Sequence, residues 1–297
     1  MFTHVTRLLF VAWFAALGAL VVRGQEHGWT LGVWLGLYLL LFLHPTLLAV
    51  EFALLRRVSR RVNGTRLAAG TLLRAWLGEW IDSTRTFGWR LPWRADAVPD
   101  HLPATTHGRR GVVLVHGFIC NRAVWNPWLA RLRLLDRAFV AVNLEPAFAE
   151  IDGYVASIEA AVARVEATTG LPPVVIAHSM GGLVVRAWLR TGAAHHARVA
   201  SVVTIASPHR GTWLAGLSLS PNGKQMRQGA AWMNALAEAP AHAELFTCWW
   251  SECDQIVFPP PTAVLPGAES RQLAGVAHVS LCLREEIWDD LVGRLDP

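Results

Sequence analysis

Charged residues are scarce in this chain, and lysine is almost missing. Only 16% of the 297 residues are charged, against about 25% in an average soluble domain, and Lys224 is the sole lysine. Hydrophobic residues make up 53% of the chain. This composition excludes a disordered or fibrous protein and favours a segment that enters a membrane.

Cysteine is rare as well. The four cysteines include no C-x-x-C pair, which excludes a disulfide-rich scaffold and gives no sign of a zinc site. No group of histidines and carboxylates has the spacing of metal ligands, so we expect neither a metal nor a cofactor. The net charge of +5 comes almost entirely from arginine, but no nucleic-acid-binding module accompanies it, so we expect no nucleic acid partner.

Two uncharged stretches lie near the N-terminus, from Leu8 to Val22 and from Gly28 to Val50. The second would be about 34 Å long as a helix, enough to cross a hydrocarbon core of about 30 Å. The first crosses only if its helix begins nearer Phe2 and Arg7 extends to the interface. The alternative for the first stretch is a secretory signal with Arg7 as its basic region. Because a longer apolar stretch follows directly, we expect two transmembrane helices within residues 1–55.

Residues 56–109 are expected to form a basic juxtamembrane helix and a linker, extended from Phe87 onward. Basic residues favour the cytoplasmic side, so we expect both termini and the following domain to be cytoplasmic, at a bacterial-type inner membrane. The cluster comprises Arg56, Arg57, Arg60, Arg61 and Arg66. Six apolar residues then recur at helical spacing and either face lipid headgroups or pack on the next domain: Leu72, Leu73, Trp76, Leu77, Trp80 and Ile81.

Residues 110–297 alternate between short apolar runs and helical patterns. Continuous apolar runs are typical of parallel strands that are covered on both faces. The expected strands are 111–115, 139–144, 173–177, 199–206, 245–250 and 273–276, and the expected helices are 152–169, 183–190 and 283–295. This order predicts a doubly wound, mostly parallel α/β sheet.

The segment Ala177-His178-Ser179-Met180-Gly181-Gly182 follows one of these strands. A serine at a tight turn between a strand and a helix has its hydroxyl lifted above the end of the sheet, and small neighbours relieve the crowding. The usual pattern is G-x-S-x-G, and Ala177 replaces its first glycine. Ser179 is therefore the candidate nucleophile.

At these residues the sequence resembles the α/β-hydrolase family, and its lipase-like members in particular. The resemblance covers roughly residues 111–293 and includes the segments 114–118, 177–182 and 207–212, with Ser207 in place of a threonine. It implies a serine ester hydrolase, a lipase or carboxylesterase, that forms an acyl-enzyme on Ser179. The fold implied is the α/β-hydrolase fold.

Serine needs a base and a group that orients the base. His278 fits the family order of serine, acid and histidine, whereas His116, His178 and His209 are expected to be structural. Asp254 matches the S-x-x-D-x-x-V-x-P pattern of the family and precedes His278 by 24 residues (278 − 254). Glu252 is the alternative acid.

Backbone N–H groups must stabilise the oxyanion of the intermediate. By analogy with the family, these donors are the N–H groups of Phe118 and Met180.

A long segment, residues 207–244, separates two expected strands and is predicted to be a lid. Its apolar residues either line an acyl cleft or form an ordinary core: Trp213, Leu214, Leu217, Leu219, Met226, Trp232, Met233 and Leu236. The expected partners are thus the lipid bilayer and an acyl ester or lipid substrate. Cys248 and Cys253 would be bridged only in an oxidising compartment, and nothing in the sequence identifies a calcium site.

Two alternatives remain open at this point. An acyltransferase would use the same acyl-enzyme and pass the acyl group to an acceptor other than water. A non-catalytic membrane interaction module would share only the fold.

Overall fold

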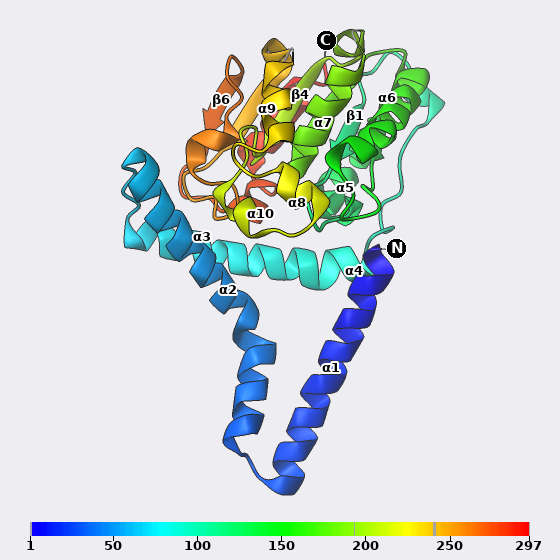
Figure 1. Cartoon of the computed structure of the whole chain (residues 1–297). Helices are drawn as coiled ribbons and strands as arrows, with labels where there is room; N and C mark the ends of the chain where they lie inside the picture. Colours follow the sequence, from blue (N-terminus) through cyan, green and yellow to red (C-terminus); the bar gives the residue numbers. More distant parts are fainter. Residues whose placement is uncertain (1, 193, 240–241, 297) are drawn as a thin grey trace.

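The computed structural model describes residues 2–192, 194–239 and 242–296. Two long helices, α1 (Phe2–His27) and α2 (Leu31–Asn63), form a hairpin that projects from the rest of the molecule (Figure 1). The spans Thr3–His27 and Leu31–Asn63 have mean hydropathies of 2.1 and 2.0, and 0% and 17% of their most apolar windows are buried. By length and composition, these helices suggest membrane anchoring.

Helix α2 continues without a break through the arginine cluster to Asn63. Helix α3 (Ala69–Ser83) follows and runs across the base of the globular part, above the hairpin (Figure 1). It leads into a π-helical segment, η1 (Thr84–Arg90), and a single turn, α4 (Leu91–Trp93). The expected extended connection from Phe87 is therefore wrong as far as Trp93, because Pro92 lies in a first helical turn, where its missing N–H is not needed.

The apolar residues of α3 divide between the two expected environments. Leu72 is buried, whereas Leu73, Leu77 and Ile81 are exposed. Trp76 Nε1 donates a hydrogen bond of 3.0 Å to the carbonyl oxygen of Pro45, which ties α3 to α2. One side of α3 thus packs on the protein, and the other is an apolar surface.

Six parallel strands form one sheet in the order β2-β1-β3-β4-β5-β6. They are β1 (Val112–Val115), β2 (Phe139–Ala141), β3 (Val174–His178), β4 (Ser201–Ile205), β5 (Phe246–Trp250) and β6 (Glu269–Gln272). Helices α6 (Val155–Thr169) and α7 (Met180–Thr191) share one hydrophobic cluster with the sheet, and α5 (Asn126–Leu134) and α11 (Glu285–Gly293) share the other. The predicted doubly wound α/β fold is confirmed.

The last strand lies four residues earlier than expected, at Glu269–Gln272 in place of 273–276. β6 is an edge strand whose side chains are mostly exposed, so its sequence is polar and carries no apolar run. Residues 273–277 lead instead into α10 (His278–Leu281).

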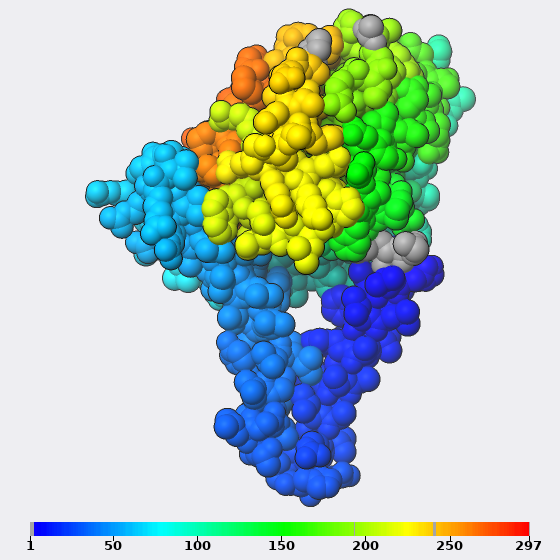
Figure 2. Space-filling model, in the orientation of Figure 1, coloured from blue at the N-terminus to red at the C-terminus, as the bar shows by residue number. Residues whose placement is uncertain are grey.

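The segment between β4 and β5 contains the turn η6 (Trp213–Leu217) and the helices α8 (Pro221–Gln225) and α9 (Ala231–Glu238). Figure 2 shows it, in yellow, on the visible face directly above the hairpin. The remaining 3-10 turns are η2 (Ala104–Thr106), η3 (Arg122–Trp125), η4 (Ile151–Tyr154), η5 (His195–Arg198), η7 (Ala243–Leu245) and η8 (Pro260–Ala263).

A third hydrophobic cluster joins the helices near the hairpin to the loops at the edge of the sheet. Phe52 and Leu55 of α2 and Ala75 of α3 pack there with Cys253, Phe258 and Ala277. The base of the hairpin therefore touches the loops that carry Asp254 and His278.

Candidate active site

Ser179 occupies the bend between β3 and α7. Its φ of 55° and ψ of −127° lie outside the regions that side chains favour, at a cost on the order of 1–3 kcal/mol. Its N–H donates to the carbonyl oxygen of Ile205 at 2.8 Å, and the following turn requires Gly181. A Cβ at Gly181 would lie 2.7 Å from the carbonyl oxygens of Val115 and His116. This strained, crowded bend is the geometry predicted from the motif.

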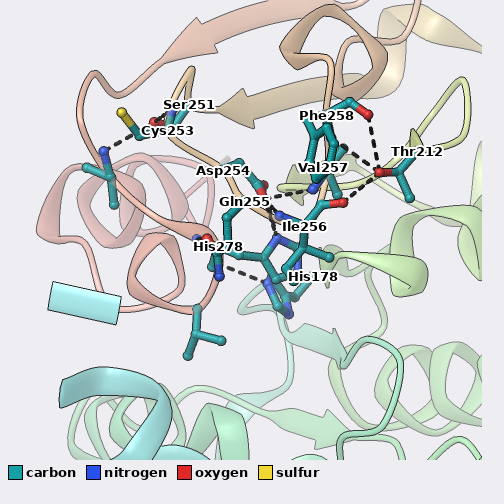
Figure 3. A network of polar contacts seen from close by, with 12 residues as sticks. His178, Thr212, Ser251, Cys253, Asp254, Gln255, Ile256, Val257, Phe258 and His278 are labelled. Carbon is teal, nitrogen blue, oxygen red and sulfur yellow. Dashed lines mark hydrogen bonds and ion pairs between the residues drawn. The ribbon is translucent and has the colours of Figure 1, made fainter. Parts of the chain in front are cut away.

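Asp254 and His278 form a buried pair (Figure 3). Nδ1 of His278 lies 3.0 and 2.9 Å from the two carboxylate oxygens of Asp254. Oδ1 of Asp254 also accepts hydrogen bonds from the N–H groups of Ile256 and Val257, at 2.9 and 2.8 Å. These contacts fix the carboxylate and make Nδ1 the protonated nitrogen, which leaves Nε2 as an acceptor.

The pKa of His278 reflects two opposing effects. Burial lowers it, but the charge and hydrogen bond of Asp254, together with the charges of Glu79 and Glu51, raise it more, so the pKa of His278 lies above its usual 6.5. A general base must be neutral to accept a proton, so activity that depends on His278 should fall as the pH drops through this raised pKa.

Among the described residues, the hydroxyl of Ser179 forms no hydrogen bond with the His278 ring, and the neighbours that they share place Ser179 relative to the pair. Ser179 lines one apolar cavity together with Ile256 and Val257, which adjoin Asp254. The ring of His178, the residue before Ser179, has its centroid 4.6 Å from that of His278, and His178 Nε2 donates to the His278 carbonyl oxygen at 3.3 Å. The serine and the pair thus meet at the same edge of the sheet.

The carboxylate of Glu252 binds groups other than His278. It accepts hydrogen bonds from the N–H of Gly275 at 2.9 Å and from Gln272 Nε2 at 3.0 Å. Of the two acids weighed from the sequence, Asp254 is the one that contacts His278.

The other histidines hold loops. His116 Nδ1 donates to the carbonyl oxygen of Gly117 at 2.8 Å, and its Nε2 accepts from the N–H of Leu144 at 2.9 Å. Burial lowers the pKa of His116 to about 4. His209 shares a hydrogen bond of 3.0 Å with the Thr204 hydroxyl.

Phe118 and Met180 follow β1 and β3, and both lie beside Ser179 in the fold. Phe118 lines the same cavity as Ser179, and Met180 is the first residue of α7. Within the described ranges, neither backbone N–H donates to another protein group. Both are therefore available to an oxygen that enters the cavity.

Residues 112–294 match the model of the alpha/beta hydrolase family. The chain belongs to the alpha/beta hydrolase family. A search of the curated proteins finds no match.

Solved structures of lipases share this fold. The mature lipase BlEst2 of Bacillus licheniformis has a TM-score of 0.56 and 16% sequence identity, over 63% of this chain and 92% of the lipase. Lipase B of Aspergillus fumigatus has a TM-score of 0.54 and 18% identity, over 62% of this chain and 52% of the lipase. At these identities the likeness establishes the fold.

The cavity of this alpha/beta hydrolase has a volume of about 300 Å³. Its walls are mainly apolar and come from both sides of the bend at Ser179: Phe118, Pro208, Leu214, Ala215, Leu217, Met226, Ile256 and Val257. The first part of the segment 207–244 thus lines the cavity, whereas Met233 and Leu236 of α9 are buried in the core beside α7.

The four cysteines are free and buried, so Cys248 and Cys253 form no bridge in this structure. Burial raises the pKa of the thiols of Cys120 and Cys253 to about 12, which leaves them inert at neutral pH. In the described part of the chain, no group of three or more metal-binding side chains is arranged to hold a metal ion.

Sequence reasoning missed two residues beside the pair. Gln255 Oε1 accepts from the N–H of His278 at 3.2 Å, and Gln255 Nε2 donates to Glu79 of α3 at 2.9 Å. Gln255 could have been predicted, because it lies next to Asp254 in the sequence. Glu79 could not, because it is about 200 residues from its backbone partners and no nearby motif marks it.

Proposed function

We propose that this protein is a membrane-anchored serine hydrolase that cleaves carboxylic esters through an acyl-enzyme on Ser179. The observation that carries the proposal is the buried Asp254–His278 pair beside a strained serine at the mouth of an apolar cavity. The alpha/beta hydrolase family and the likeness to lipases support an ester substrate.

The chemistry follows from these groups. His278 Nε2 takes the proton of the Ser179 hydroxyl as its oxygen attacks the ester carbonyl, while Asp254 holds Nδ1–H and stabilises the imidazolium. The N–H groups of Phe118 and Met180 hold the oxyanion, each worth about 3–4 kcal/mol in the transition state. His278 then passes its proton to the departing alcohol. In the second half, water attacks the acyl-enzyme while His278 takes its proton, and His278 returns that proton to the Ser179 oxygen as the acid leaves.

The substrate proposed is a lipid ester taken from a bilayer surface. Leu217 and Leu219, beside the cavity, are 67% and 84% exposed, and they belong to the segment that lies above the hairpin in Figure 2. Leu73, Leu77 and Ile81 of α3 add further exposed apolar surface at the base of the globular part. An apolar rim of this kind favours contact with acyl chains.

An ester panel of graded chain length tests the function. We expect the detergent-solubilised full chain to hydrolyse acyl esters and Ser179→Ala to lose at least about 10³-fold of that activity. Product analysis with an added alcohol separates hydrolysis from acyl transfer. No hydrolysis or transfer by the folded full chain, with any ester of the panel, would refute the proposal.

The placement in the membrane is part of the proposal. The arginines at the end of α2 favour a cytoplasmic hydrolase domain. A fused periplasmic reporter that is active at the C-terminus would contradict this orientation.

A further inference from the structure

Glu79 projects from α3 into the loop that carries His278. Its Oε1 accepts a hydrogen bond from the N–H of Val279 at 2.9 Å, and its Oε2 accepts from the N–H of Ser280 at 3.0 Å. A second, longer contact joins Oε2 to the Val279 N–H at 3.1 Å. A single side chain of the juxtamembrane helix therefore holds the two backbone amides that follow the candidate base.

Gln255 extends this contact to His278 itself. Its amide nitrogen donates to Glu79 Oε1 at 2.9 Å, and its amide oxygen accepts from the His278 N–H at 3.2 Å. Three consecutive backbone N–H groups, from His278 to Ser280, are thus fixed directly or through one residue by Glu79. Because Gln255 adjoins Asp254, the same chain of contacts reaches the loops of both the acid and the base.

The burial of Glu79 requires an explanation, since an unpaired carboxylate inside a protein is costly. The side chain is only 1% exposed, and within the described part of the chain none of the hydrogen bonds that it accepts comes from a cation. Nearby Asp82, also on α3, accepts from the Ser280 hydroxyl at 2.7 Å and is less buried. A leucine or methionine at this position would leave the N–H groups of Val279 and Ser280 without the acceptor they now have, so the carboxylate fixes the backbone that follows His278.

We propose that Glu79 is a positioning residue for His278, through which the juxtamembrane helix completes the active site of this hydrolase. The proposal rests on the function of His278 proposed above. It implies that α3 belongs to the catalytic unit and that a hydrolase domain cut after α3 lacks part of its active site.

The charge of Glu79 also acts on His278. Burial is the largest effect on the pKa of His278 and lowers it, whereas Asp254, then Glu79, and then Glu51 of α2 raise it. Burial raises the pKa of Glu79 itself, while the hydrogen bonds from Val279, Gln255 and Ser280 and the charge of His278 favour its ionised form. Removal of that charge should lower the pKa of His278, so the acid limb of kcat/KM should move to lower pH. A purely structural anchor would change stability and leave this limb in place.

The test compares Glu79→Gln with Asp82→Asn in the detergent-solubilised full chain. Both variants turn a carboxylate of α3 into an amide of the same size, but only the first touches the amides after His278. For Glu79→Gln we expect kcat to fall by about 10- to 100-fold with KM nearly unchanged. Its acid limb should move to lower pH, because a negative charge near His278 is lost. Asp82→Asn should match the unsubstituted protein in all three quantities.

Glu79→Asp provides the second variant in case Glu79→Gln does not fold. Aspartate keeps the negative charge, but its side chain is one methylene shorter and no longer reaches the N–H groups of Val279 and Ser280 in the same way. We therefore expect kcat to fall while the acid limb stays near its original pH. Unchanged kcat and acid limb in either folded variant would overturn the inference. Ser179→Ala distinguishes this outcome from failure of the proposed function, because an unsubstituted protein no more active than Ser179→Ala would refute the function itself.

Discussion

Replacement of Asp254 by asparagine tests the role of the buried pair. Oδ1 of Asp254 accepts from two backbone N–H groups, at 2.9 and 2.8 Å, so the single oxygen of an asparagine should stay at that position. The amide nitrogen would then take the place of Oδ2, 2.9 Å from Nδ1 of His278. An N–H donor there opposes the proton on Nδ1, which keeps only Oδ1, at 3.0 Å, as an acceptor, and this shifts the ring toward the tautomer that carries its proton on Nε2.

That tautomer cannot accept the proton of Ser179. The equivalent change in a serine protease triad lowers kcat by about 10⁴-fold, which corresponds to roughly 5.4 kcal/mol at about 1.36 kcal/mol per tenfold. We expect a loss of this size for Asp254→Asn, with the fold retained because the backbone contacts of Oδ1 survive. Loss of the carboxylate charge should also lower the pKa of His278 and move the acid limb of the residual activity to lower pH.

The assay is steady-state hydrolysis of a soluble short-chain ester across pH, with thermal unfolding measured on the same samples. Glu252→Gln is the matched control, since it makes the same chemical change two residues earlier, at a side chain that bonds Gly275 and Gln272. Its kcat/KM should stay close to that of the unsubstituted protein. A folded Asp254→Asn with nearly full kcat, or a larger loss in Glu252→Gln, would refute the reasoning.

Three further outcomes follow from the structure. The acid limb of kcat/KM should have its midpoint above pH 6.5, because His278 must lose a proton to act as the base and its pKa is raised. A midpoint below pH 6.5 would contradict the assignment of His278 as the base. Gly181→Ala should destabilise the protein by about 1–3 kcal/mol in denaturant unfolding, since its Cβ would meet two carbonyl oxygens at 2.7 Å, and an unchanged midpoint would argue against the crowded bend. The double variant Leu217→Ser and Leu219→Ser should lose long-chain ester hydrolysis more than short-chain ester hydrolysis. Leu134→Ser is the control, because Leu134 is 87% exposed on α5, and it should show no such difference. Equal losses of long-chain and short-chain hydrolysis in the double variant would count against an acyl-binding rim.

The elements that the sequence predicted well carry their signal locally. β1, β3 and β4 are buried on both faces, so each appears as an unbroken apolar run. The bend at Ser179 needs small residues within a few positions of the serine, and these stand next to it in the chain. The fold and the bend at Ser179 were thus accessible from short segments.

The features that sequence reasoning missed depend on distant contacts or on exposure. β6 is polar because it is the edge of the sheet, and no apolar run marked its position. Glu79 resembled any acidic residue of an amphipathic helix, because its partners are the backbone N–H groups of residues about 200 positions later. The sequence also left open whether the stripe of α3 faces lipid or protein, and the structure assigns Leu72 to the protein and Leu73 to the surface.

Reaction with a fluorophosphonate, followed by peptide mapping, tests most directly whether Ser179 is an activated nucleophile. We predict one covalent adduct on Ser179 in the folded full chain, no adduct in Ser179→Ala, and much slower labelling in His278→Ala. An unlabelled folded protein, or an adduct on another serine with Ser179 untouched, would contradict the account.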